Sequence, residues 1–449
     1  MNHALIVHYH FLPVHNVAVK QLVGYAKHLP TFGWRAQVLT REWRGIHEAD
    51  PSWGLSWEPE LERGSGCKVH RVPHSTGTPP RAPARRPPGA RQGRSAEPRW
   101  GTALMAKIEA KRLGMGRILF GDYPDEFVSW APSAVEAGVE LVRRERVDVI
   151  MSYCPPETNH VVGHQLALRL GVPWVAFFGD MYGFLDAALP AYSIERLLRT
   201  AWHRRCLAPA AACVAVSPAM VEHLQRSYRK PAHLVVTGVD PDEFPQAAAE
   251  PVSTRDRLVV SHVGSVYPGD QRPDIFFDGL DMLLTQKPEI AQCLEVRFVG
   301  SKCDDRLHAM LEGRPAAHVC TIEPKVDSRT AISLVRSSDA LLAFTCTAHR
   351  DRHGTLSYPT KIFEAIAARR PVLSIPADGD WVDELLARTG GGTSARDGAE
   401  VADQLQSWFA SWSRDGSVPF HGRPAEIATL SLDRQVEHLA GLFDSVCSG

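Results

Sequence analysis

The chain of 449 residues is too long for one ordinary domain and suits two domains of about 200 residues each. Its residues are 44% hydrophobic and 22% charged, as in a soluble globular protein with an extensive core. The net charge of −1 gives no overall field for binding nucleic acid, and no apolar run reaches the roughly 18 residues of a transmembrane helix. The nine cysteines form no CxxC pair, so we interpret them as reduced core thiols of a cytoplasmic protein.

The N-terminal region shows the pattern of a strand, a loop, a helix and a second strand. Residues 4–9 begin with a short apolar run, which lacks the basic flank and the length of a signal peptide. Apolar residues then recur at helical spacing over 19–29, and Asn16 suits the N-cap of that helix. Residues 35–40 are again strand-like. This βαβ unit predicts a parallel sheet with right-handed crossovers.

Further apolar runs of strand length continue this pattern in two series, with helical patterns between most of them. The first series is 147–153, 174–178, 213–216 and 234–236, and the second is 258–263, 294–299, 319–322, 340–344 and 371–375. We therefore predict an α/β protein with two doubly wound, Rossmann-like domains facing across a cleft. The expected domains are 1–240 and 250–425, and a C-terminal helix at 426–449 is expected to pack back toward the first domain.

Two segments of the first domain do not match this core pattern. Residues 74–99 consist largely of Pro, Arg and Gly and are expected to form a mobile surface insertion. Residues 101–121 are basic and partly amphipathic. A helix beside the cleft is the favoured interpretation of this second segment, and weak peripheral contact with the inner face of a membrane is the alternative.

The segment 354–371, GTLSYPTKIFEAIAARRP, carries the strongest chemical signal. A loop with a glycine follows the expected strand at 340–344 and leads to a helix that begins near Thr360, where free backbone N–H groups attract anions. Lys361 in the first turn suggests an anionic ligand, and Glu364 on the same face suits the two hydroxyls of a ribose. The alternative is an ordinary helix in which Lys361 and Glu364 form a surface ion pair.

This segment resembles the donor-binding segment of glycosyltransferase family 4, which has the two-domain GT-B fold. Further stretches are similar to the same family and occur in its order: LIVHYHFLPVHNVAVKQLVGYAKHLPTFGWRAQVLT, DVIMSYCPPETNHVVGHQLALRLGVPWVAFFGD, CVAVSPAMVEHL, VVTGVDPDEF, LVVSHVGSVYPGDQRP and LVRSSDALLAF. The resemblance covers nearly the whole chain apart from about 45–125. It implies transfer of a sugar, with retention, from a nucleotide-sugar co-substrate to an unidentified acceptor, with no other cofactor.

The resemblance also implies roles for residues of the second domain. Glu364 would hydrogen-bond the donor ribose, and the loop that ends before Lys361 would face the donor sugar and the diphosphate. A turn after the first strand would let the backbone approach the phosphates, with a cation just beyond it. The implied donor-binding residues are Gly264, Ser265, Arg272, Thr360, Lys361 and Glu364.

In the first domain the resemblance implies that His160 and Asp180 face the transferred sugar or the acceptor and are the candidate catalytic residues. An equally weighted interpretation is that Asp180 caps the loop after its strand. The chain departs from the family at two places. His15 and Asn16 replace two glycines of the first loop, and Leu356 stands where many members carry a glutamate.

No metal site is expected. Two acidic triplets, 240–242 and 378–380, match the DxD pattern of metal-dependent transferases, but neither follows a strand in a lone nucleotide-binding domain. Arg272 and Lys361 could instead stabilise the leaving diphosphate. The alternatives to a transferase are a catalytically degenerate binding or activator protein and, less favoured, a nucleotide-sugar epimerase.

Overall fold

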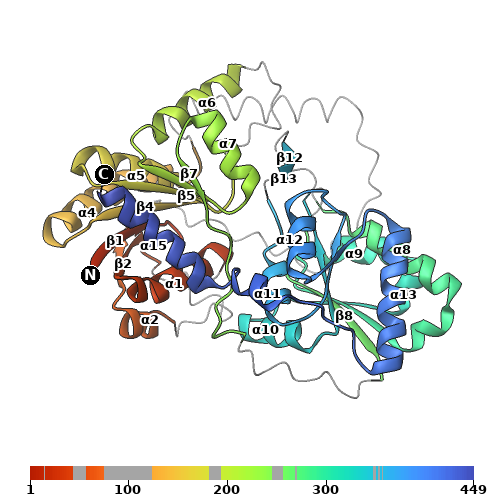
Figure 1. The fold of residues 1–449 in the computed structure, drawn as a ribbon. Helices are drawn as coiled ribbons and strands as arrows, with labels where there is room; N and C mark the ends of the chain where they lie inside the picture. Colours follow the sequence, from red (N-terminus) through yellow and green to blue (C-terminus); the bar gives the residue numbers. More distant parts are fainter. Residues whose placement is uncertain are drawn as a thin grey trace.

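The structure is a computed structural model that describes residues 1–14, 16–43, 57–74, 124–181, 194–244, 256–267, 271–346, 350–351, 354–355 and 357–448. Two parallel sheets, each flanked by helices, make up the molecule (Figure 1). The prediction of two doubly wound α/β sheets is confirmed. The placement of the domain boundaries at 1–240 and 250–425 stays a prediction.

The first sheet has seven strands in the order β3-β2-β1-β4-β5-β6-β7. Its strands are β1 (Asn2–Val7), β2 (Trp34–Arg41), β3 (Lys68–Val72), β4 (Val149–Cys154), β5 (Trp174–Phe178), β6 (Ala212–Ala215) and β7 (Ala232–Leu234). The helical segments of this half are α1 (Val17–His28), η1 (Leu29–Phe32), α2 (Trp57–Ser65), η3 (Val128–Trp130), α4 (Ala131–Arg144), α5 (Thr158–Leu170), α6 (Ile194–Leu207) and α7 (Pro218–Tyr228).

The second sheet has six strands in the order β10-β9-β8-β11-β14-β15. These are β8 (Leu258–Val263), β9 (Leu294–Val299), β10 (Cys320–Glu323), β11 (Ala340–Phe344), β14 (Val372–Ile375) and β15 (Gly392–Ser394), and a short antiparallel pair joins β12 (Arg350–Asp351) to β13 (Gly354–Thr355). The helical segments are α8 (Pro273–Gln286), η6 (Pro288–Gln292), α9 (Asp304–Leu311), η7 (Pro315–His318), α10 (Ser328–Ser337), α11 (Lys361–Ala367), α12 (Trp381–Thr389), α13 (Gly398–Asp415) and α14 (Pro424–Ala428).

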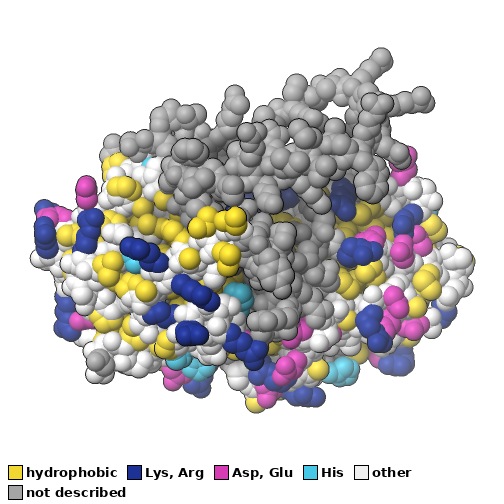
Figure 2. All heavy atoms as spheres, turned by 90° about the horizontal axis from the view of Figure 1, so that it is seen from above, with side chains coloured by type: hydrophobic (Ala, Val, Ile, Leu, Met, Phe, Trp, Pro, Cys, Tyr) yellow, Lys and Arg dark blue, Asp and Glu magenta, His cyan; other side chains and the backbone are white. Residues whose placement is uncertain are grey.

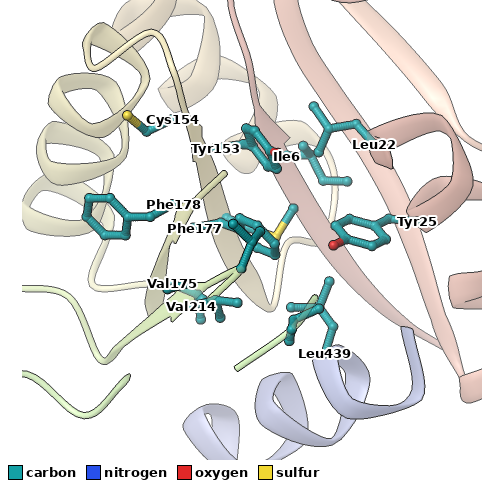
Figure 3. Packing of buried hydrophobic residues seen from close by; sticks show 14 of the residues in the cluster. Ile6, Leu22, Tyr25, Tyr153, Cys154, Val175, Phe177, Phe178, Val214 and Leu439 are labelled. Carbon is teal, nitrogen blue, oxygen red and sulfur yellow. The ribbon is translucent and has the colours of Figure 1, made fainter. Parts of the chain in front are cut away.

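The central strands are buried along their whole length. Every residue of β4, β5 and β11 is buried, because helices cover both faces of a parallel sheet. In the first core, the rings of Tyr153 and Phe177 stack with centroids 4.8 Å apart. Figure 3 shows these rings with Tyr25 from α1 and Leu439 from the C-terminal end of the chain. The core of the first sheet is therefore completed by a helix from the far end of the sequence.

That helix is α15 (Leu432–Ser448), which packs on α1 and η1 of the first half (Figure 1). Phe443 is fully buried, with its ring 5.2 Å from that of Trp34. The indole N–H of Trp34 also donates to Asp444 at 3.0 Å. The chain thus ends on the sheet where it begins.

The two passages of the chain between the sheets lie against each other. The backbone N–H of Val239 donates to Leu430 at 3.2 Å, and the N–H of Leu432 donates to Val239 at 2.9 Å. Beside this contact, a Cβ on Gly238 would lie 2.7 Å from the Cα of Leu432, so only glycine fits there. We call this pair of backbone segments, 238–239 and 430–432, the crossing seam.

Among the helices in the described ranges, none combines the length and apolarity needed to cross a membrane. The expected surface insertion beyond His74 and the basic segment 101–121 lie outside the described residues.

Candidate functional site

The predicted diphosphate-binding region lies between the end of β8 and the start of α11. Lys361 begins α11, and its ammonium donates to the carbonyl of Ser265 at 2.8 Å and contacts Nε2 of His262 at 3.2 Å. Nδ1 of His262 lies 3.0 Å from the carbonyl of Leu342, so this nitrogen carries the proton that it donates. Nε2 of the neutral ring then carries a lone pair, which accepts a hydrogen bond from the Lys361 ammonium.

No carboxylate of the described residues contacts the ammonium of Lys361. Among the described residues Lys361 forms no ion pair, and two of its three N–H groups are directed at Ser265 and His262. Burial lowers the pKa of Lys361 to about 8, against an opposing effect of Glu364. Burial also lowers the pKa of His262 to about 3, so the imidazole stays neutral. At neutral pH the site therefore presents a cation with an N–H available to an anion.

Gly264 lets the backbone of this turn approach the lysine. Its φ of +114° lies in a region that residues with a Cβ rarely adopt. A Cβ at this position would also lie 2.6 Å from Cε of Lys361. The structure thus brings together Gly264, Ser265 and Lys361, three of the residues that the sequence nominated.

Glu364 lies one turn further along α11 and is paired across the molecule. Its Oε1 accepts from Nζ of Lys20 on α1 at 2.8 Å, and the same ammonium lies 2.8 Å from Oε2 of Glu243. Burial alone would lower the pKa of Lys20, but Glu364 and Glu243 raise it above its usual value. The alternative of a surface pair between Lys361 and Glu364 is not found, because the two side chains bind different partners.

A cavity of about 500 Å³ opens beside this ion pair. α1, α2, the segment 237–243 and the start of α11 form its walls, with apolar side chains such as Phe363 between the charged ones. Its lining includes Lys20, Glu243, Glu364 and the predicted donor residue Thr360. The charged groups of the cavity therefore come from both halves of the molecule.

Arg272 does not join the cluster at Lys361. It stands at the N-cap of α8, where its guanidinium donates to both carboxylate oxygens of Asp274 at 2.9 and 2.6 Å. This contact raises the pKa of Arg272, chiefly through the hydrogen bonds that it donates to Asp274. Its charge is already matched by the neighbouring carboxylate.

The ring of His160, a predicted catalytic residue, is enclosed in this structure, and its role toward the sugar stays a prediction. His160 lies in α5 with no exposed surface, and its Nδ1 is 2.7 Å from Oγ of Ser152. Its ring packs 4.6 Å from that of Phe178, and burial lowers its pKa to about 3. His160 is a neutral core residue that packs against the ends of β4 and β5 through Ser152 and Phe178.

Asp180 follows β5 and is partly buried. Its Oδ1 accepts from the backbone N–H of Met181 at 2.7 Å, which is the capping contact expected of a residue after a strand. Asn16 caps α1, with its side chain accepting from the N–H of Val19 at 2.8 Å, and this prediction is confirmed. His15 and Leu356 lie outside the described residues.

Sequence reasoning missed Lys20 and Tyr358. The hydroxyl of Tyr358, in the second half, donates to the carbonyl of Val216 at 2.8 Å and accepts from the N–H of Thr237 at 3.3 Å. Both residues act across the interface between the sheets. No local pattern predicts such contacts, because they depend on how the two sheets are placed.

The two carboxylates of the acidic triplet 240–242 both contact one lysine. Lys27, two turns beyond Lys20 on α1, contacts Asp240 at 2.7 Å and Asp242 at 2.5 Å. Within the described ranges, no group of three or more His, Cys, Asp or Glu side chains is arranged to hold a metal ion.

Comparison with known proteins places this architecture. The fold is similar to sucrose-phosphate synthase from Thermosynechococcus elongatus, with a TM-score of 0.64 and 14% identity over 100% of both chains. It is similar to Anabaena HepE in complex with UDP and glucose, with a TM-score of 0.62 and 15% identity over 99% of this chain and 100% of that one. A glycosyltransferase from Rickettsia africae has a TM-score of 0.60 and 12% identity over 99% of this chain and 98% of that one.

Two facing Rossmann-like sheets with the charged site between them define the GT-B class of fold, and at these identities the solved structures show the fold alone. Residues 18–240 match the family described as glycosyl transferase 4-like domain. The first half of the chain is therefore a glycosyl transferase 4-like domain, and the protein is a glycosyltransferase with the GT-B fold. No curated protein sequence matches it.

Proposed function

We propose that the chain transfers a sugar from a nucleoside diphosphate sugar to a hydroxylated acceptor, with retention and without a metal ion. The observation that carries this proposal is the ammonium of Lys361, held on the Gly264–Ser265 turn by two neutral acceptors. A diphosphate gains negative charge as the glycosidic bond breaks, and a fixed cation nearby stabilises that charge. Arg272 is not assigned this task because Asp274 already neutralises it.

Glu364 is the proposed ribose ligand. It lies one turn of α11 from Lys361 and lines the cavity between the sheets. A carboxylate at this spacing from a phosphate-binding cation accepts hydrogen bonds from the two ribose hydroxyls, as acidic residues do in other nucleotide-binding sheets. HepE, which shares the fold, is described in complex with UDP-glucose, and this supports a nucleoside diphosphate sugar as donor here.

Nucleotide binding tests the donor half of the proposal. UDP, GDP, ADP and TDP are each added to the protein, and a rise in melting temperature reports binding. We expect at least one of them to bind and Lys361→Met to weaken its binding by tenfold or more, roughly the value of one charge-assisted hydrogen bond. If none of the four raises the melting temperature of the wild-type protein, the proposed donor site is wrong.

Turnover tests the chemical half. The sugar derivative of the nucleotide that binds is incubated with the protein and a panel of sugar and lipid-linked acceptors, and NMR of the product reports the anomeric configuration. We expect the donor's configuration in the product and the same rate with and without EDTA. Asp180→Asn, at the end of β5, should lower kcat more than it changes donor binding if Asp180 serves the acceptor side.

A further inference from the structure

Lys20 is shared between two carboxylates from different parts of the chain. Its Nζ lies 2.8 Å from Oε1 of Glu364 on α11 and 2.8 Å from Oε2 of Glu243 in the segment that follows the crossing seam. α1 lies in the half of the molecule built on the first sheet and α11 in the half built on the second, so the contact bridges the two halves. All three side chains are half-buried or better, with exposed fractions of 35%, 31% and 14% for Lys20, Glu364 and Glu243.

The contact leaves half of the Glu364 carboxylate available. Among the residues that the structure describes, the bond from Lys20 to Oε1 is the one hydrogen bond of this carboxylate, so Oε2 can accept from a ligand. Without Lys20, two carboxylates would approach each other in a partly buried place, and burial already raises the pKa of Glu243. Repulsion from Glu243 would then turn Glu364 away from its present direction.

We propose that Lys20 is a positioning residue for nucleoside recognition, acting through Glu364. It fixes the carboxylate by Oε1 so that Oε2 meets the ribose hydroxyls, and it ties that orientation to the placement of α1 against α11. This inference rests on the proposed function, in which Glu364 is the ribose ligand. It extends the donor site to a side chain of the opposite sheet.

Lys27 provides a matched control on the same helix. It too is bound by two carboxylates, those of Asp240 and Asp242, and it too lines the cavity. Its carboxylate partners both belong to the segment after the seam, so it makes no ion pair with α11. Lys27→Met therefore removes an equivalent charge and an equivalent pair of contacts without changing the partner of Glu364.

The test compares ribonucleotides with deoxyribonucleotides. Calorimetry measures the binding of UDP, 2′-deoxy-UDP, GDP and 2′-deoxy-GDP to wild type, Lys20→Met, Lys20→Arg, Lys27→Met and Glu364→Gln. We expect Lys20→Met to weaken ribonucleotide binding about tenfold and to lose most of the preference for ribose, as Glu364→Gln does, since each removes a charge-assisted contact. Lys20→Arg should keep much of the preference for ribose, and Lys27→Met should keep all of it, because Lys27 lines the cavity without contacting Glu364.

The double variant shows whether Lys20 acts through Glu364. In the Glu364→Gln background, Lys20→Met should change affinity by less than about twofold, because the group that it positions is already lost. With the sugar donor, Lys20→Met should raise KM and change kcat little. Melting temperatures identify any variant that is unfolded, and Lys20→Gln replaces Lys20→Met if the latter fails to fold.

The outcomes separate this inference from the proposed function. If the wild type binds no nucleotide, the proposed function fails and this inference fails with it. If Glu364→Gln loses the ribose preference while Lys20→Met keeps it, only the role of Lys20 is wrong. Tighter binding by Lys20→Met would likewise overturn the inference, since it would show that Lys20 competes with the nucleoside for Glu364. Additive losses in the double variant would show that Lys20 acts independently.

Discussion

Lys361 is placed differently from most partly buried lysines, because its neighbours in contact are a carbonyl and a neutral imidazole. An ammonium in such surroundings keeps its charge only at a cost, and this cost appears as the lowered pKa. A phosphate that binds the remaining N–H stabilises the charged form of the lysine and offsets this effect of burial. The site is thus preorganised for binding an anion.

This environment predicts that nucleotide binding depends on pH. With a pKa of about 8, Lys361 is charged at pH 7 and loses its proton as the pH rises. Affinity for a nucleoside diphosphate should therefore fall roughly tenfold between pH 7 and pH 9. The neighbouring His262 stays neutral over this range, while Lys302 and Glu364 influence the lysine with opposite signs. Calorimetry from pH 6 to pH 10 measures the effect.

Lys361→Arg is the control for this pH dependence, because guanidinium stays charged throughout the range. A wild-type profile as flat as that of the arginine variant would contradict the prediction.

The free energy of unfolding should change with pH in the opposite direction to the nucleotide affinity. Burial of the charged lysine destabilises the folded state below pH 8, because its pKa is lowered from 10.5 to about 8. Between pH 8 and 10.5 the unfolded state binds more protons, so this destabilisation decreases and the free energy of unfolding rises with pH.

Gly264 carries a second prediction at this scale. Gly264→Ala should cost about 1–3 kcal/mol of unfolding free energy, because its φ is unfavourable for alanine and its Cβ would overlap Lys361. Displacement of Lys361 should also weaken nucleotide binding. Gly416 has a φ of +70° and no atom within 4 Å of an added Cβ, so Gly416→Ala should cost stability but leave nucleotide affinity unchanged. Equal affinity for both variants would contradict the role of the turn.

The contact between Gly264 and Lys361 could be predicted because both follow strands of one parallel sheet, whose carboxyl ends meet at one edge. The partner of Glu364 could not, since Lys20 belongs to the other sheet. His160 shows a different limit. The family resemblance implies that His160 faces the sugar or the acceptor, whereas in the structure its ring packs on Phe178 and contacts Ser152.

At the scale of elements, α1 begins where Asn16 satisfies a backbone N–H that the helix leaves unpaired. Asn16→Ala should therefore lower the unfolding free energy by about 1 kcal/mol, whereas Asn16→Ser should be nearly neutral, because serine also caps helices well. Urea denaturation measures both. Since α1 carries Lys20, fraying of its first turn should also weaken nucleotide binding. An alanine variant as stable as the wild type would show that the cap contributes little.

The strands that the sequence predicted best are the buried ones. The residue ranges 174–178, 258–263 and 340–344 match β5, β8 and β11 at both ends, because covered parallel strands are largely apolar runs. The range 294–299 also matches β9 at both ends, although Glu295 and Arg297 are only partly buried. The edge strands β3 and β15 were missed. Their residues are mostly only partly buried, so they mix polar and apolar side chains and resemble loops.

At the scale of the whole molecule, α15 fastens the end of the chain to its beginning. Phe443→Ala should lower the unfolding free energy by about 3–5 kcal/mol, since it empties a fully buried site beside Trp34. His438→Ala, at an exposed position of the same helix, is the control. Guanidinium unfolding followed by tryptophan fluorescence compares the two. A loss of less than about 1 kcal/mol for Phe443→Ala would show that α15 is loosely attached.

The crossing seam has a mechanical consequence. If the two chain segments that connect the sheets lay far apart, they would restrict the sheets to rotation about the line between these segments. Here the passages are bonded side by side at Val239 and Leu432, so they work as a single short pivot. The cavity that holds Lys20 and Glu364 is lined by residues of that pivot. Atoms near a pivot are displaced least by rotation about it. Glu364 would therefore keep its contact with Lys20 while the distant rim of the cleft opens for a sugar donor to enter.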